Sequence, residues 1–411
     1  MACNCARITV IFTRTAIETA RVYIIYVADK LYRTVPEPMK ICIVCPYNMQ
    51  SAGGVQAHIH DSANELVKLG HSVTVLSPGD GSNHTVYENY IETGKCRRIV
   101  FNQTEFDISF AYGADYRKLK ELLHREQFDI IHYHTLWTPF LCAQVLWLSE
   151  TVNIATFHDT PPDTVSGKLT RIVFVLLGKI LYRMLDAMIA VSPAPAGHLP
   201  RNRNGKLYIL PPCTSLEPFR VHPAANTCND DTVTILFLGR LEERKGIFVL
   251  LSAFRKLQMD GLDVRLRIAG SGRLEEKIRQ YIRDNNISNI ELLGAVRDAE
   301  KVECYSGCDI FCSPAIHGES FGIVLVEAMA AGKPVIAAEN KGYINILNEK
   351  KKECLCIPGS DTDLYEKLKK LVTDRNLRQQ LGKWGAEESR KYDCCTIIPA
   401  LVDIYRKTLD Q

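Results

Sequence analysis

Apolar and polar residues alternate between two patterns from residue 39 onward. Short apolar runs at 41–47, 71–78, 128–134, 152–158 and 187–193 predict buried strands. Stretches with helical spacing lie between them, and the one at 55–70 ends at Gly70, a good helix stop. Regular alternation of strand and helix indicates a parallel sheet with right-handed crossovers.

The alternation stops at 210–229, where four prolines lie among polar residues and indicate a linker. A second series then begins. Its strands are predicted at 234–239, 264–270, 290–296, 309–314 and 334–338, and its helices at 246–259, 273–285, 322–331 and beyond 361. The predicted fold class is α/β, with two doubly wound domains that face a central cleft. Ligands of such sheets bind outside the carboxyl ends of the strands.

The first 38 residues stand apart from this pattern. Ile17, Ala20, Ile24, Val27 and Leu31 recur at helical spacing, which predicts an amphipathic helix. It would lie on a membrane surface, pack on the body, or result from a wrongly assigned start, because Met39 begins the α/β pattern. We favour the last two interpretations.

Composition narrows the class of protein. A length of 411 residues predicts two or three domains, and 46% hydrophobic with 24% charged residues excludes a disordered chain. The net charge of +3 is too small for a general electrostatic attraction to nucleic acid, so no nucleic-acid partner is expected. No apolar stretch is long enough to span a membrane.

The chain has 15 cysteines, and Arg7, Arg14 and Arg21 interrupt any secretory signal. We therefore expect buried or free thiols in a reducing cytosol. Cys42 and Cys45 form a C-x-x-C within a predicted strand. Positions three apart on a strand face opposite sides, so this pair is not expected to share a metal.

Three motifs carry candidate chemistry. Gly53 and Gly54 follow the first strand and open a helix, where free amides favour an anion, although a plain tight turn is the alternative. Arg240 and Lys245 follow the strand at 234–239 and suit a diphosphate. Arg244, between them, is either part of this group or a solvated charge.

The third motif, HGESFGIVLVEAMAAG, is the most specific. It places Glu319 in a glycine-containing loop and Glu327 eight residues later on an apolar helix. Loop amides at a helix start can hold phosphate or sugar oxygens. A carboxylate on an apolar helix is costly unless it is hydrogen-bonded, and a ribose diol is a suitable partner.

These motifs resemble the donor site of the retaining family 4 glycosyltransferases, which have the GT-B fold. The stretches at 39–58 and 317–332 look most like those of bacterial phosphatidylinositol mannosyltransferases. The resemblance implies a nucleotide-diphosphate sugar as donor substrate, no cofactor and no metal. It covers the chain from about residue 39 and implies two facing domains and a last helix that crosses back. Together with the pattern it predicts an extension at 1–38, an acceptor-binding domain at 39–212, a linker at 213–231, a nucleotide-sugar domain at 232–392 and the crossing helix at 393–411.

The resemblance also implies residue roles. His134 would approach the reacting sugar, and Arg240 with Lys245 would bind the diphosphate as it leaves. Glu319 would hold the transferred sugar and Glu327 the ribose. The residues implied in donor binding are Gly53, Gly54, Arg240, Lys245, Glu319, Ser320, Phe321, Gly322, Ile323 and Glu327. The resemblance further implies front-side attack with retention, and the sequence places no second carboxylate as a covalent nucleophile.

The acceptor is poorly encoded: a lipid-linked or a glycan acceptor fits. Arg117, Lys118 and Lys120 on a predicted helix offer a patch for an anionic membrane surface, with a solvated helix face as the alternative. Asp107 and the P-P-C at 211–213 depart from the inositol-lipid relatives. We expect a cytoplasmic protein, with peripheral association at the inner face of the membrane left open. A sugar-nucleotide epimerase and a non-catalytic sugar-binding protein are the rival functions.

Overall fold

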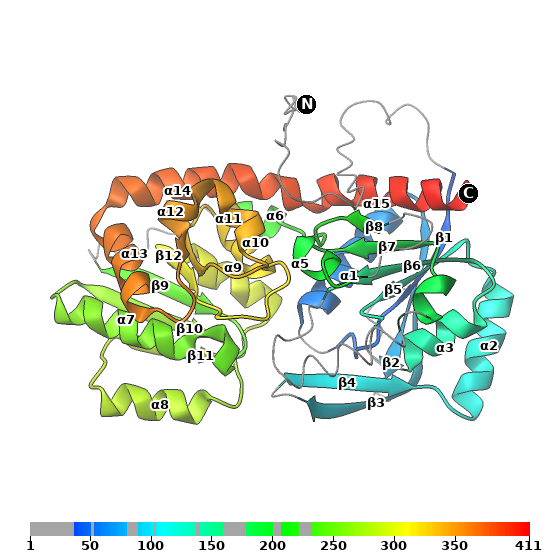
Figure 1. Cartoon of the computed structure of the whole chain (residues 1–411), viewed down its shortest axis with the longest axis horizontal. Coiled ribbons are helices and arrows are strands. Elements are labelled where there is room, and N and C mark those ends of the chain that lie inside the picture. The colour runs from blue at the N-terminus through cyan, green and yellow to red at the C-terminus, as the bar shows by residue number, and fades with distance from the viewer. Residues whose placement is uncertain are drawn as a thin grey trace.

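The computed structural model describes residues 37–50, 53–79, 89–101, 104–136, 140–158, 178, 180–199, 207–221 and 232–411 (Figure 1). The helix expected at 17–31 lies outside these residues. Two α/β domains lie side by side, and each is built on its own sheet. No described helix is both long and apolar enough to cross a membrane.

The sheet of the N-terminal domain has the strand order β4-β3-β2-β1-β5-β6-β7-β8. Its strands are β1 (Lys40–Val44), β2 (Ser72–Gly79), β3 (Tyr90–Phe101), β4 (Thr104–Phe110), β5 (Ile130–His134), β6 (Val152–Phe157), β7 (Ala187–Ala190) and β8 (Leu207–Ile209). The expectation of a wholly parallel sheet is wrong at one edge, because β3 and β4 pair antiparallel. This hairpin was not predicted, since charged residues interrupt the apolar pattern of β3.

The sheet of the C-terminal domain has the order β11-β10-β9-β12-β13-β14, and its described pairings are parallel. Its strands are β9 (Val233–Leu238), β10 (Val264–Ala269), β11 (Ile290–Gly294), β12 (Ile310–Ser313), β13 (Val335–Ala338) and β14 (Leu355–Cys356). The first strand of each series is central, so each sheet is doubly wound.

Helices cover both sheets (Figure 1). Those of the N-terminal domain are α1 (Gly54–Lys68), α2 (Ala114–Glu126), α3 (Leu141–Leu148), η1 (Tyr182–Met184) and α5 (Pro193–Ala196). Those that follow β9 are η2 (Glu243–Lys245), α7 (Ile247–Met259), α8 (Glu275–Asp284), α9 (Asp298–Ser306), α10 (Ile323–Ala330), α11 (Ile344–Leu347), η3 (Asn348–Lys350), α12 (Lys351–Cys354), α13 (Asp361–Thr373), α14 (Arg375–Glu388), η4 (Ser389–Tyr392) and α15 (Cys394–Leu409). Between these two groups, α6 (Glu217–Val221) packs on α9 and α10 of the C-terminal domain.

The last helix, α15, belongs to the first domain. In Figure 1 it runs from the C-terminal domain across to the N-terminal domain. Ile397, Ile398, Leu401 and Tyr405 are buried with residues of β1 and α1 in one hydrophobic cluster. The apolar face of the C-terminal helix is therefore buried in the hydrophobic core of the N-terminal domain.

The cysteines divide into two groups. Cys42 and Cys45 pack into separate hydrophobic clusters on opposite faces of the first sheet, as the strand pattern predicted. Cys213 and Cys394 form a disulfide, so the expectation of buried or free thiols is wrong for this pair. Sequence reasoning could not find it, because 181 residues separate the two. The other ten described cysteines form no disulfide.

Candidate functional site

The candidate residues lie where the strand order reverses in each sheet. In the first sheet β1 lies between β2 and β5, and in the second β9 lies between β10 and β12. Gly53 and Gly54 follow β1, His134 ends β5, and Arg240 follows β9. Glu319 lies in the loop between β12 and α10. Ligands of doubly wound sheets bind at such switch points.

Five charged side chains of alternating sign form one chain of ion pairs after β9. Arg240 pairs with Glu242 at 3.0 Å, Glu242 pairs with Arg244 at 2.8 Å, and Arg244 pairs with Glu319 at 2.9 Å. Lys245 closes the chain, with its Nζ 2.7 Å from the same Oε1 of Glu319. The structure thus brings Arg240, Lys245 and Glu319 together in one network with a net positive charge.

Exposure differs along this chain of ion pairs. The side chains of Lys245 and Glu319 are only 15% and 11% exposed, whereas Arg240 is 52% exposed. Burial alone would raise the pKa of Glu319, but Lys245 and Arg244 outweigh it and lower that pKa below its usual range. Burial lowers the pKa of Lys245, opposed by Glu319. Arg240 is therefore the accessible cation, and Lys245 is held in place behind it.

Arg244 is not a solvated charge. Its guanidinium donates to Glu242 at 2.8 Å, to Glu319 at 2.9 Å and to the carbonyl of Gly318 at 3.2 Å. Its side chain is 17% exposed. Arg244 therefore fixes the loop that carries Glu319 against the segment after β9.

Glu327 lies on α10, where Val326 and Ala328 on either side of it are fully buried. The hydroxyl of Tyr305 donates to its Oε2 at 2.7 Å. Burial raises the pKa of Glu327, and the nearby charge of Lys301 partly opposes this. The cost of burying this carboxylate is thus only partly offset by its neighbours, so it is suited to accept further hydrogen bonds from hydroxyl groups.

The loop before α10 also contacts the N-terminal domain. The hydroxyl of Ser192, which caps α5, donates to the carbonyl of Ser320. A methyl group on Gly54 would lie 3.5 Å from Cδ1 of Ile323, so the start of α1 faces the start of α10. Of the remaining predicted loop residues, Phe321 stacks edge-on against Tyr392 at 5.3 Å.

Gly322 begins α10 in a conformation that requires glycine. Its φ is 114°, and a methyl group there would lie 2.7 Å from the ring of Tyr343. The motif glycine therefore allows the loop amides to turn into the helix. By contrast, Gly53 is extended, with φ at −176°.

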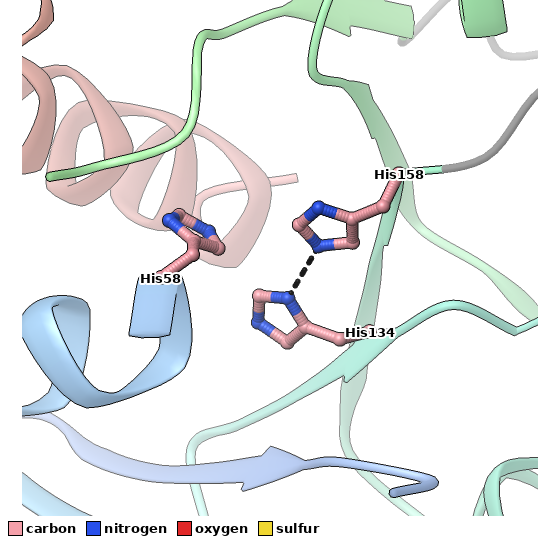
Figure 2. A group of neighbouring side chains, drawn as sticks. All are labelled: His58, His134 and His158. Atoms are coloured by element: carbon pink, nitrogen blue, oxygen red, sulfur yellow. Dashed lines mark hydrogen bonds between the residues drawn. The ribbon is translucent and has the colours of Figure 1, made fainter. Parts of the chain in front are cut away.

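His134 lies in a cluster of four buried histidines. Figure 2 shows three of them, His58, His134 and His158. Nδ1 of His134 is 2.9 Å from Nε2 of His158, and the ring centroid of His134 is 5.3 Å from that of His58. The ring centroid of His132 is 4.5 Å from that of His134. Nδ1 of His132 is hydrogen-bonded to the hydroxyl of Tyr405 on α15, at 2.6 Å. Within the described part of the chain, Nε2 of His134 has no hydrogen-bond partner.

Burial keeps these imidazoles neutral. It lowers the pKa of His58 to about 4 and that of His132 to about 3, and it lowers the pKa of His134 and His158 as well. One nitrogen from each of His58, His134 and His158 lies within 4.8 Å of the others, so among the described residues these three could hold a metal. His134 and His158, however, already occupy one nitrogen each on one another.

Sequence reasoning missed several of these residues. Glu242 lies only two positions after Arg240, but a carboxylate among cations gave no signal of its own. His58 and His158 lie in the predicted helix and strand as single histidines, which are more often structural. Tyr305 comes from a different helix, α9, and only the fold places it beside Glu327.

Known families match both domains. Residues 52–217 match the model described as Glycosyltransferase Family 4, and residues 219–388 match that of Glycosyl transferases group 1. A phosphatidyl-myo-inositol mannosyltransferase of Mycolicibacterium smegmatis is 32% identical over 370 residues, which cover 89% of this chain and 93% of that protein. The protein of the same name from Propionibacterium freudenreichii is 29% identical, over 89% and 94% of the two chains.

Solved structures with low identity share the fold. Anabaena HepE, in complex with UDP and glucose, has a TM-score of 0.71 at 18% identity, over 89% of this chain and 98% of that one. The sucrose-phosphate synthase of Thermosynechococcus elongatus has a TM-score of 0.70 at 19% identity, over 90% and 99%. Both the architecture and the sequence thus lead to one conclusion: the chain is a glycosyltransferase of GT-B architecture and belongs to family 4, group 1.

Proposed function

We propose that this enzyme transfers a hexose, with retention of configuration, from a nucleotide-diphosphate sugar to a lipid-linked or glycan acceptor. The chain of ion pairs from Arg240 to Lys245 carries the proposal. It offers one accessible and one buried cation beside a carboxylate, which suits a diphosphate that gains charge as it leaves.

Each site residue has a proposed role. Arg240 and Lys245 bind the diphosphate and stabilise its charge, and the amides of 320–323 at the start of α10 bind phosphate or sugar oxygens. Glu319 accepts from hydroxyls of the transferred sugar, and Glu327 accepts from the ribose. His134 approaches the reacting sugar, and its neutral imidazole with an unpartnered Nε2 can donate to or accept from a hydroxyl.

The start of α1 completes the donor site. Gly53 and Gly54 lie at its N-terminus, and Gly54 faces Ile323 of the other domain. Backbone without a side chain permits a close approach of phosphate or sugar to the amides there.

A metal is not needed in this proposal. The cations of the chain itself supply the charge that a divalent metal supplies in other phosphate sites. Retention then follows from front-side attack, in which the departing phosphate helps to deprotonate the acceptor hydroxyl. NMR of the product tests this step: retention of the anomeric configuration is expected, and inversion would overturn the mechanism.

The donor is proposed to be GDP-mannose, with a UDP-sugar as the alternative. Relatives with up to 32% identity are named mannosyltransferases, whereas the structurally similar HepE binds UDP and glucose. A thermal-shift panel of GDP, UDP and their sugars separates the two, and an assay with the best donor follows. Transfer to an acceptor supports the proposal; an epimerised donor without transfer would instead identify an epimerase.

The acceptor is proposed to lie at an anionic membrane surface, approached through the N-terminal domain. Arg117, Lys118 and Lys120 are all exposed on α2. Beside the start of this helix the exposed rings of Phe110, Tyr112 and Phe140 form one cluster, with Phe110 5.6 Å from Phe140 and 6.5 Å from Tyr112. Cations beside exposed aromatic rings suit the interface of a bilayer.

Flotation with vesicles tests the membrane surface. The enzyme is expected to float with vesicles that contain phosphatidylserine and to remain behind with neutral phosphatidylcholine vesicles. Glutamate at 117, 118 and 120 should abolish flotation. Glutamate at the exposed Lys277, Arg279 and Arg283 of α8 is the matched control and should leave it intact. Equal loss in both variants would contradict a specific surface on α2.

A further inference from the structure

The two segments that connect the domains lie side by side. One leaves β8 and runs through 210–216 to α6, and the other leaves η4 and enters α15. Thr214 and Asp393 pair as a parallel bridge, and the amide of Cys394 donates to the carbonyl of Thr214 at 3.3 Å. Arg220 pairs with Asp393 at 2.5 Å. The chain therefore crosses between the domains twice at one place.

The Cys213–Cys394 disulfide joins these two crossings covalently. The Cα atoms are 4.8 Å apart, and the two residues are 181 apart in sequence, so the closed loop contains the whole second sheet. Both side chains are buried. The carbonyl of Cys213 also lies 3.2 Å from Nδ1 of His58, and the amide of Ser215 donates to Asp61 at 2.8 Å. The first crossing is thus fixed to α1, and the disulfide fixes the second crossing to the same place.

We propose that Cys213 and Cys394 form a reversible dithiol–disulfide site whose oxidised state restrains rotation of the two domains. Rotation of one domain against the other must turn about the two crossings, which can shift against one another only while Cys213 and Cys394 are unbonded. A covalent bond between them removes that freedom, and it also constrains the unfolded chain through a long loop. The consequence for catalysis rests on the proposed function, because sugar transfer needs the cations of one domain to meet His134 of the other.

The redox step balances with a low-molecular-mass disulfide, such as oxidised glutathione, as the oxidant. One cysteine thiolate attacks it, forms a mixed disulfide and releases one glutathione thiolate. The second cysteine thiolate then attacks the protein sulfur of the mixed disulfide and releases the second. The bond between Cys213 and Cys394 forms, the glutathione disulfide breaks, and two electrons pass to the two glutathione molecules. The two protons from the cysteine thiols go to the glutathione thiolates or to solvent.

The test equilibrates the full chain across ratios of reduced to oxidised glutathione. Thiols are trapped with iodoacetamide in denaturant, so that buried thiols also react, and mass spectrometry reports which cysteines are alkylated. We expect Cys213 and Cys394 to lose alkylation together as the oxidised fraction rises. Oxidation should also slow hydrogen exchange in 210–221 and 389–398, raise the Tm by several degrees and slow turnover severalfold. Alkylation of both residues throughout, or unchanged exchange at the crossings, would overturn the proposal.

Variants separate this pair from other thiols. Cys213→Ser and Cys394→Ser should keep the exchange, Tm and turnover of the reduced enzyme at every glutathione ratio. Cys395→Ser is the matched control, because Cys395 is an exposed thiol next to Cys394 and should leave the transition intact. If a serine at the buried position 213 prevents folding, oxidised and reduced wild-type enzyme still give the comparison.

Exchange and alkylation need no substrate, so the two proposals fail separately. A redox transition that changes exchange at the crossings, in an enzyme with no sugar transfer in either state, would support this site and refute the proposed function. In an enzyme that does transfer sugar, a redox transition with identical turnover in both states would overturn the claimed restraint on the domains.

Discussion

Nζ of Lys245 lies 2.7 Å from Oε1 of Glu319, and both side chains are almost buried. Glu319→Gln would leave Lys245 and Arg244 without their shared anion. Because an uncompensated buried charge is costly, we expect the free energy of unfolding to fall by about 3 kcal/mol and transfer to fall with it. Urea unfolding measures the free energy of unfolding, and a transfer assay measures the activity. Glu291→Gln, which removes a half-exposed partner of Arg267, should cost less than about 1 kcal/mol. Equal losses in both variants would contradict the argument.

Arg240→Ala should separate catalysis from stability. The guanidinium is half exposed, so its loss should hardly change the Tm. If it stabilises the charge of the departing diphosphate, kcat should fall by roughly 10²-fold. Lys256→Ala is the control, because this half-buried cation on α7 pairs with Asp361 instead. An unchanged kcat in Arg240→Ala would remove Arg240 from the proposed site.

Glu327 should make donor binding depend on pH. Burial raises its pKa above the usual 4.5, so it ionises in the folded protein only as the pH rises further. Between pH 4.5 and this raised pKa the folded state loses stability as the pH rises, because the buried carboxyl must ionise. Ribose binding through the carboxylate strengthens over the same range. Isothermal titration with the nucleotide should show an affinity that rises with pH in this range. Glu327→Gln should flatten the profile, and a profile unchanged by that variant would assign the dependence elsewhere.

The buried histidines should make the enzyme sensitive to acid. Their pKa values are lowered from 6.5, to about 4 in His58 and about 3 in His132. Below pH 6.5 the unfolded chain therefore binds more protons, and each such histidine removes up to about 1.4 kcal/mol of stability per pH unit. Urea unfolding at several pH values measures this slope. His132→Asn should reduce it, whereas His124→Asn, at an exposed position on α2, should not. A slope that His132→Asn leaves unchanged would contradict the assignment.

Transfer should persist in the presence of EDTA, because the cations of the site belong to the chain. The measurement is a transfer assay after dialysis against the chelator, with metal content checked by mass spectrometry. Loss of activity that returns with one added metal would overturn this prediction. His58→Asn would then show whether the histidine cluster holds that metal.

The sequence identified most strands and the three motifs because each is local. The apolar runs mark β1, β2, β5 and β9, and the motif around Glu319 fits in one loop and one helix. The β3–β4 hairpin was missed because β4 is the edge strand of its sheet and charged residues break the apolar pattern of β3. Edge strands need only one buried face, so their composition gives a weak signal.

Contacts between distant segments could not be predicted. Arg244 was ambiguous because its role depends on Gly318 and Glu319, more than 70 residues later. His134 gained His58 and His158 as buried neighbours only when α1 and the end of β6 met β5. Spacing reports which side chains share an element, whereas these relationships arise from packing between elements.

The position of α15 has a consequence for how the protein forms during synthesis. Ile397, Leu401 and Tyr405 complete a core that begins at β1. A ribosome that has made residues 39–212 has therefore made a domain that lacks one of its covering helices. The first domain to emerge is the last to be finished, and a fragment cut at the linker would expose the apolar surface that α15 covers.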